Sequence, residues 1–282
     1  MKVARSIAEF RAARAALPSP VGFVPTMGYL HEGHLSLVRL SREQDATTVA
    51  SIFVNPTQFG PTEDLSSYPR DLDRDLDLLE AEGVSLVLVP EDGEFYPPGY
   101  DTWVDVEALS TRLEGASRPG HFRGVTTVVS KLFHIMSPDR AYFGQKDAQQ
   151  VVVIQRMVRD LSFGLEIVVG PTIREPDGLA MSSRNAYLSP EERAAAPVLR
   201  RALDAAEAAY AAGERNGETL RSVASDVLAQ EPLADPVYVS VADIDTLEEL
   251  DRVADSALVS MAVRFGTTRL IDNCILGAHA QA

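Results

Sequence analysis

Over its first 170 residues the chain alternates short apolar runs with segments of helical periodicity, and this alternation restricts the fold more than any other feature. The apolar runs suit buried strands, and most of them end at Pro, Gly or Asn-Pro turn signals. Strands that alternate with helices predict βαβ units, and hence an α/β fold with a parallel, doubly wound, Rossmann-like sheet. The predicted strands are 21–25, 48–54, 84–89, 140–143 and 165–169, and the predicted helices are 1–17, one from near 34, 69–82, 124–136 and 147–159.

Beyond about residue 185 the texture of the sequence changes. Two alanine-rich stretches, 190–212 and 218–230, are typical of helices, and the segments 237–241 and 257–264 are typical of strands. We therefore expect the doubly wound domain to be followed by a smaller α+β C-terminal domain. The predicted domains are residues 1–175 and residues 176–282.

The charge balance excludes two classes of partner. With 26 Lys and Arg against 41 Asp and Glu, the formal net charge is −15, whereas nucleic acids and anionic membranes require a basic surface. The single cysteine, Cys274, allows no intrachain disulfide, and the charged N-terminal segment lacks the apolar core of a signal peptide. No apolar run is long enough to span a membrane. We expect a cytoplasmic protein that binds neither nucleic acid nor membrane.

The segment from Pro25 to His34 is the strongest candidate for a functional site. It connects a predicted strand to a predicted helix, where backbone N–H groups and the helix dipole favour a bound phosphate. Gly28 and Gly33 allow close approach of the backbone to a ligand, and the spacing of His31 and His34 lets both side chains face it. The alternatives are histidines that only cap or pack the helix, and a metal pair, for which partner ligands are lacking. The segment matches neither a Walker A motif nor GxGxxG.

Two short motifs resemble those of a known superfamily. HEGH at 31–34 resembles the HxGH motif of the nucleotidylyltransferase superfamily, which includes class I aminoacyl-tRNA synthetases. In that superfamily the histidines contact nucleotide phosphates and stabilise charge while the α-phosphorus is attacked. MSSR at 181–184 resembles the KMSKS-type loop, whose hydroxyls and cation hold the departing pyrophosphate. Because the two motifs occur in the superfamily's order, they favour nucleotide binding over a merely polar loop at 181–184.

The whole chain is similar to the pantothenate synthetase (pantoate–β-alanine ligase) family. Five sequence blocks carry the resemblance, in the family's order, between about residues 20 and 190. They are PTMGYLHEGH at 25–34, SIFVNPTQF at 51–59, RPGHFRGV at 118–125, FGQKDAQQ at 143–150 and AMSSRN at 180–185. The resemblance implies an ATP- and pantoate-binding domain, a C-terminal lid domain and, commonly, a homodimer.

Carried over position by position, the resemblance assigns roles to individual residues. It gives catalysis to His31, His34, Lys146, Ser182, Ser183 and Arg184, with His34 as the proton donor. It gives ATP binding to those six residues together with Met27, Gly28, Tyr29, Leu30, Glu32, Gly33, Gly144, Gln145, Asp147, Ile173 and Met181. It gives binding of pantoate and β-alanine to Pro25, Met27, Asn55, Gln58 and Gln150.

The chemistry of the substrate-binding residues agrees with this assignment in part. Gln58 and Gln150 are neutral amides that donate and accept hydrogen bonds, which suits a small hydroxy acid. Asn55 lies in an Asn-Pro turn, so a structural role is equally open. His121 and Arg123 either line the site or order their own loop.

Four aspartates at 71, 73, 75 and 77 invite a magnesium site, but residues two apart on a helix do not share a face. We expect a solvated acidic helix at these positions, with its leucines on the buried side. Mg²⁺ would be held mainly by the triphosphate of ATP and by water. Its protein ligands stay unassigned.

The predicted function is the ATP-dependent condensation of pantoate with β-alanine to pantothenate, a step of coenzyme A biosynthesis. The resemblance implies a pantoyl-adenylate intermediate and release of pyrophosphate and AMP. Two alternatives stay open. Another HxGH-type adenylyltransferase with a phosphorylated acceptor would need extra cations where this chain has Asn55, Gln58 and Gln150. A noncatalytic nucleotide-binding protein would show erosion of HEGH or MSSR, and both are intact.

Overall fold

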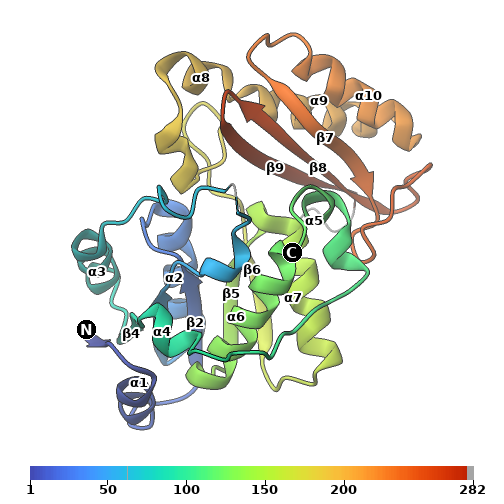
Figure 1. Ribbon diagram of the computed structural model, residues 1–282. Helices are drawn as coiled ribbons and strands as arrows, with labels where there is room; N and C mark the ends of the chain where they lie inside the picture. Colours follow the sequence, from blue (N-terminus) through green and yellow to red (C-terminus); the bar gives the residue numbers. More distant parts are fainter. Residues whose placement is uncertain (62, 278–282) are drawn as a thin grey trace. The chain divides into compact units, whose positions relative to one another are not determined.

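The chain forms two compact units in the computed structural model, which describes residues 1–61 and 63–277 (Figure 1). The first unit consists of Met1–Thr111, Gly115–Gln145 and Val153–Pro171. The second unit consists of Arg112–Glu114, Lys146–Val152 and Thr172–Ala282. Two short segments from the predicted N-terminal domain therefore group with the C-terminal unit, while the domain boundary at 175/176 stays a prediction.

The first unit is built on a six-stranded sheet in the order β1-β4-β3-β2-β5-β6. Every neighbouring pair in this sheet is parallel, which confirms the predicted doubly wound architecture. Strands covered on both faces read as continuous apolar runs, which is why their sequences were informative. The strands are β1 (Lys2–Ala4), β2 (Val21–Thr26), β3 (Thr47–Ile52), β4 (Leu86–Leu88), β5 (Arg140–Gly144) and β6 (Glu166–Gly170).

Helices cover both faces of this sheet. Right-handed crossovers place α2 and α3 on one face and α1, α6 and α7 on the other, and α2 packs on α3 as α1 packs on α6. In Figure 1, α6 crosses the face of the sheet nearer to the viewer. The helices are α1 (Ile7–Arg14), α2 (Glu32–Gln44), α3 (Leu72–Ala81), α4 (Asp92–Phe95), α5 (Leu113–Ser117), α6 (His121–Met136) and α7 (Ala148–Asp160), with 3-10 turns η1 (Pro56–Gln58), η2 (Leu109–Thr111) and η3 (Gln145–Asp147).

The topology places the functional motifs at one end of the sheet. From β2 the chain winds toward β3 and β4, whereas from β5 it winds the other way to β6. The neighbouring strands β2 and β5 thus flank the topological switch point, beyond whose carboxyl ends ligands bind in open α/β sheets. HEGH follows β2, and Gly144 ends β5.

The N-terminal segment differs from its prediction as one helix over 1–17. Its first residues form β1, which pairs with β4 at the edge of the sheet. The helix begins only after Ser6, whose side chain accepts a hydrogen bond from the N–H of Glu9. Val3 belongs to this strand and not to the helix. The sequence does not indicate the strand, because three residues are too few to show a strand periodicity.

The second unit combines a three-stranded antiparallel sheet with helices, as an α+β domain does. The helix α9 packs on α10 and on the sheet. The segment 190–212, predicted as one helical stretch, is divided into two helices by Pro197. The third strand, β9, has no counterpart in the sequence prediction. The elements are η4 (Ser183–Tyr187), α8 (Pro190–Ala195), α9 (Val198–Ala211), α10 (Gly217–Leu228), β7 (Asp235–Ala242), β8 (Ser256–Phe265) and β9 (Thr268–Gly277).

Candidate active site

The HEGH histidines form the N-terminal cap of α2. The N–H of Gly33 donates to Nδ1 of His31 at 3.2 Å, and the N–H of His31 donates to Nδ1 of His34 at 3.3 Å. The ring centroids are 4.1 Å apart, so the two side chains lie side by side. Because Nδ1 accepts in both rings, each neutral imidazole carries its proton on Nε2. The cap therefore sets two Nε2–H donors at a helix N-terminus, where an anion is favoured.

The turn before this cap is held by a buried carboxylate. Asp75 of α3 is 1% exposed, and its oxygens accept the N–H groups of Tyr29 at 2.6 Å and Leu30 at 2.7 Å. Gly28 and Tyr29 both adopt positive φ, 84° and 51°. A Cβ at Gly28 would lie 3.0 Å from the Asp75 carboxylate, so glycine fits both the dihedral and the space. The prediction of a solvated acidic helix is therefore wrong for Asp75, whose side chain is buried.

Asn55, Gln58 and Met27 form one hydrogen-bonded cluster in the first unit. Asn55 is 1% exposed, and its Nδ2 donates to Oε1 of Gln58 at 3.1 Å and to the carbonyl of Gly124 at 3.2 Å. Nε2 of Gln58 in turn lies 3.3 Å from Sδ of Met27. Pro25 lies two residues before Met27, inside β2. The structure thus brings together three of the predicted substrate-binding side chains.

His121 orders the loop that carries Gln58. Its Nδ1 lies 2.8 Å from the carbonyl oxygen of Gln58, and its Nε2 lies 3.0 Å from Nη1 of Arg118. Arg118 also forms a bidentate ion pair with Glu63, with N–O distances of 2.6 and 2.7 Å. Of the two roles that the sequence left open for His121, ordering of the loop is the one these contacts show. Arg123 lies over the ring of Trp103, 4.7 Å from its centroid.

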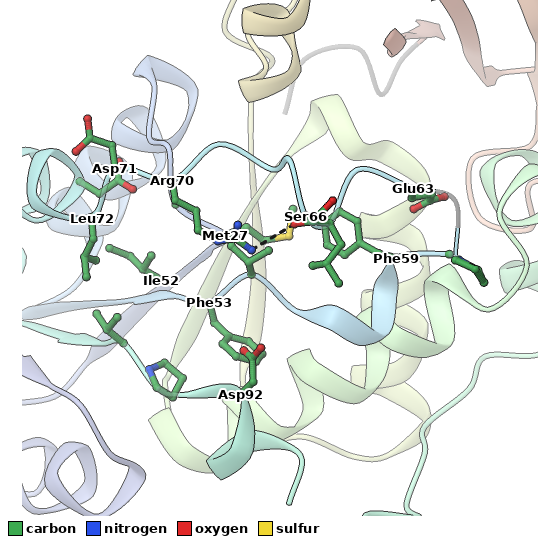
Figure 2. Close-up of a pocket in the computed structure, with 18 residues that line it drawn as sticks. Met27, Ile52, Phe53, Phe59, Glu63, Ser66, Arg70, Asp71, Leu72 and Asp92 are labelled. Atoms are coloured by element: carbon green, nitrogen blue, oxygen red, sulfur yellow. Dashed lines mark hydrogen bonds between the residues drawn. The ribbon is translucent and has the colours of Figure 1, made fainter. Parts of the chain in front are cut away.

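A cavity of about 730 Å³ lies in the first unit beside this cluster. Its walls come from the residues that follow β2, β3 and β4 and from the loop that leads into α3. Met27 lies at the centre of the lining residues in Figure 2. Met27 and Gly28 are the predicted site residues that line it, whereas Pro25, Asn55 and Gln58 do not. Other lining side chains are Ile52, Phe53, Phe59, Glu63, Leu65, Arg70, Asp71, Leu72, Asp75, Val89 and Asp92.

Lys146 opens α7 through η3 and belongs to the second unit. Its backbone carbonyl accepts a hydrogen bond from Nδ2 of Asn273 in β9 at 2.9 Å, and its Nζ lies 3.6 Å from Oδ1 of Asp147. The position of the lysine backbone is thus fixed by a strand that sequence reasoning missed. Gln150 lies on the first turn of α7, and the neighbouring Gln149 is buried, with Nε2 donating to the carbonyl of Arg112.

The MSSR loop is anchored within the same unit. The N–H of Met181 donates to the carbonyl of Ile173 at 2.9 Å, and the side chain of Ser182 accepts the N–H of Arg184 at the start of η4. The strand-like pairing of Arg174 with Ala180 closes this hairpin. Arg174 also forms a bidentate ion pair with Asp272 of β9, with N–O distances of 2.6 and 2.9 Å. Ser183 is 9% exposed.

The predicted site residues therefore divide between the units. The first unit contains Pro25, Met27, Gly28, Tyr29, Leu30, His31, Glu32, Gly33, His34, Asn55, Gln58, Gly144 and Gln145. The second contains Lys146, Asp147, Gln150, Ile173, Met181, Ser182, Ser183 and Arg184. Among residues 1–61 and 63–277, His, Cys, Asp and Glu side chains form no cluster of three or more that could hold a metal ion.

A family model for pantoate–β-alanine ligases matches residues 2–275. The chain belongs to the pantoate–β-alanine ligase family. It is 64% identical over 278 residues to the pantothenate synthetase of Roseiflexus castenholzii, and the aligned region covers 99% of this chain and 100% of that protein. The pantothenate synthetase of Chloroflexus aurantiacus is also 64% identical, over 98% of both proteins.

Solved structures of the pantoate–β-alanine ligase family share the fold. A crystal structure of pantothenate synthetase from Thermus thermophilus is 50% identical, with a TM-score of 0.93 over 97% of this chain and 98% of that one. The ligase from Francisella tularensis, complexed with beta-gamma ATP and β-alanine, is 34% identical, with a TM-score of 0.81 over 97% of each chain. No helix among the described residues is long and apolar enough to cross a membrane.

Proposed function

We propose that this chain condenses pantoate with β-alanine to pantothenate, with ATP as co-substrate, through a pantoyl adenylate. Membership of the ligase family supports the overall reaction, and a family member has been crystallised with beta-gamma ATP and β-alanine. The observation that carries the first step is the HEGH cap, in which both histidines accept through Nδ1 and so present Nε2–H donors.

In the first step a pantoate carboxylate oxygen bonds to the α-phosphorus of ATP, and the bond from that phosphorus to the pyrophosphate oxygen breaks. A carboxylate needs no base to attack, so the protein contributes positioning and neutralisation of charge. His31 and His34 would donate Nε2–H hydrogen bonds to phosphate oxygens. A neutral His34 acts in this arrangement as a hydrogen-bond donor that keeps its proton, which refines the proton-donor role implied by the resemblance.

The cations and hydroxyls of the second unit suit the same nucleotide. Lys146 and Arg184 would neutralise triphosphate oxygens, and the hydroxyls of Ser182 and Ser183 would hold the departing pyrophosphate. The remaining ATP-binding assignments, from Met27 to Gly33 and at Gly144, Gln145, Asp147, Ile173 and Met181, surround these groups in the sequence. Backbone N–H groups at such loop–helix junctions bind phosphate without added charge.

In the second step the amine of β-alanine bonds to the acyl carbon of the adenylate. The bond from that carbon to the AMP oxygen breaks, AMP leaves, and the amine loses a proton to solvent. Gln58 and Gln150 would hold the pantoyl group through their amides, with apolar walls at Pro25 and Met27. Asn55 would contribute by orienting Gln58, since the two amides are hydrogen-bonded.

Mg²⁺, a homodimeric assembly and a cytoplasmic location complete the proposal. Because the described residues contain no acidic or histidine cluster for a metal, Mg²⁺ would reach the site on the triphosphate of ATP. The one cysteine, Cys274, is a buried free thiol, which fits a reducing compartment. Light scattering of the purified protein would test the dimer, which should have twice the mass of the 30.6 kDa chain.

The adenylate route is tested by exchange of labelled pyrophosphate into ATP without β-alanine. Pantoate-dependent exchange is expected in the wild type, and His34→Ala should lose it while retaining its fold. His134→Ala, the same change at an exposed position of α6, should exchange as the wild type does. Folded wild-type protein that binds ATP without any exchange would instead favour a noncatalytic nucleotide-binding protein, and exchange without pantoate another adenylyltransferase.

A further inference from the structure

Tyr96, which directly follows α4, is hydrogen-bonded to the buried Asn55 amide. Its O–H donates to Oδ1 of Asn55 at 2.8 Å. The same oxygen accepts the hydroxyl of Thr57 at 3.0 Å and the N–H of Thr57 at 3.4 Å. The N–H of Thr57 can only donate, and the carbonyl of Gly124, which faces the other end of the amide at 3.2 Å, can only accept, so the end that meets Tyr96 is the carbonyl oxygen. The NH₂ of Asn55 is consequently turned to the opposite side.

The orientation of Asn55 then determines that of Gln58. Nδ2 of Asn55 faces the Gln58 side chain at 3.1 Å, and a donor can be matched there only by the carbonyl end of Gln58. The NH₂ of Gln58 therefore points away from Asn55, toward Sδ of Met27 at 3.3 Å. A thioether sulfur is a weak acceptor, so an oxygen of a ligand can replace it at little cost.

We propose that Tyr96 is a positioning residue that, through Asn55, holds Gln58 with its NH₂ directed at the acid substrate. The proposal rests on the proposed function, because it takes Gln58 as a pantoate-binding residue. Pantoate offers hydroxyl and carboxylate oxygens as acceptors, which an NH₂ group satisfies. A reversed Gln58 would set its carbonyl oxygen against those oxygens, so the relay selects an acceptor-rich acid.

The surroundings of Tyr96 keep its hydroxyl a donor. The ring packs edge-on against Tyr100, with centroids 5.0 Å apart, and lies 6.4 Å from the ring of Phe53. Burial raises the pKa of Tyr96 to about 12, although a hydrogen bond from Thr57 works in the opposite direction. Nζ of Lys131 lies over the same ring, 5.0 Å from its centroid. The hydroxyl is therefore protonated at any pH used for assay.

Tyr96→Phe tests the relay by removing one oxygen and keeping the ring. The KM for pantoate should rise about tenfold, as expected for the loss of one orienting hydrogen bond. The KM for ATP and the melting temperature should stay near wild type, because the ring packing is retained. Tyr100→Phe is the matched control: it deletes a hydroxyl from the same aromatic cluster and should leave all three values unchanged.

Asn55→Asp provides a second, stronger test. Aspartate has nearly the same shape but places an oxygen opposite Gln58, so it forces the Gln58 amide to reverse. The KM for pantoate should rise about a hundredfold, as for two lost polar contacts, while ATP binding, measured by calorimetry, reports that the variant is folded.

Three results would overturn the relay: an unchanged pantoate KM in Tyr96→Phe, an equal rise of both KM values with a lower melting temperature, or near-wild-type pantoate use by Asn55→Asp. Failure of the proposed function would be distinguishable, because the wild type itself would then lack pantoate-dependent exchange.

Discussion

At the scale of single residues, Asp75 is the side chain that most directly supports the HEGH cap. Its two carboxylate oxygens accept neighbouring N–H groups of the turn that precedes His31. Arg74 adds a hydrogen bond to the carbonyl of Leu30 at 3.0 Å and lies 3.7 Å from the carboxylate. Such charge-assisted bonds, made by a buried carboxylate to two successive N–H groups, fix a backbone that already has two residues at positive φ.

Asp75→Asn should weaken both stability and ATP use. The Asn amide has nearly the volume of the Asp carboxylate but offers only one acceptor oxygen to the two N–H groups. Its NH₂ group would therefore face the other N–H, so that two donors oppose each other. We expect a loss of about 2 kcal/mol in the free energy of unfolding and a fall of about tenfold in kcat/KM for ATP. Urea unfolding and initial-rate kinetics measure the two effects. Asp73→Asn, an exposed position of the same helix, should change neither; a similar effect of both variants would contradict the clamp.

The sequence contained a signal for Asp75 but none for Tyr96. Asp75 is three residues after Leu72 and four before Leu79, so helical spacing alone places it on the buried stripe. Charged side chains are rarely buried without partners, and the partners of Asp75 are backbone groups that no sequence pattern reveals. Tyr96 reaches Asn55 across 41 residues. Such a contact depends on tertiary packing, which periodicity does not encode.

At the scale of elements, an ion pair connects the loop between η1 and α3 to the segment that precedes α6. Glu63 is paired with Arg118, which precedes α6, and the two side chains are only 24% and 15% exposed. Burial alone would raise the pKa of Glu63, but the hydrogen bonds and charge of Arg118 outweigh it and hold the pKa below its ordinary 4.5. Glu63 also lines the cavity beside Met27 (Figure 2).

The lowered pKa of Glu63 predicts an acid-sensitive contribution to stability. A carboxylate whose pKa is lower in the folded state stabilises the protein above its unfolded pKa of about 4.5, and this contribution is lost as the pH falls through the folded value. Wild type should exceed Glu63→Gln by about 1 kcal/mol at pH 7, and the difference should shrink below pH 4.5. Urea unfolding at a series of pH values measures it. Glu107→Gln, at an exposed position, should show no such convergence, and a constant gap in Glu63→Gln would refute the assignment.

Secondary structure was predictable where packing is uniform along an element. β3 is buried at every position, so its apolar run stood out. β9 was missed because charged residues interrupt its sequence: Arg269 and Asp272 lie within it, and each is neutralised by an ion pair from elsewhere in its unit. The break at Pro197 follows from the missing N–H of proline, yet alanine-rich sequence on both sides hid it.

At the scale of the whole molecule, the net charge is −15, and exposed acidic side chains contribute to it. On α3 and its cap, Asp71, Asp73 and Asp77 are exposed, whereas Asp75 is buried. The proposed phosphate-binding groups are instead neutral or cationic, namely His31, His34, Lys146 and Arg184. A small anion needs only a few cations and N–H donors. A polyanion needs a basic surface many phosphates long.

The protein should therefore bind ATP but not tRNA. Nonspecific binding depends on the release of counterions by basic side chains, and an acidic surface adds repulsion that low salt strengthens. Fluorescently labelled tRNA should show no change in polarisation at about 10 µM protein even at about 50 mM salt, where basic proteins bind readily. ATP binding, followed by calorimetry in the same buffer, confirms that the sample is active. Because lowering the salt favours electrostatic binding, a tRNA signal that grows on dilution of salt would show that a basic surface exists despite the composition, and would reopen a tRNA-dependent reaction for this HxGH scaffold.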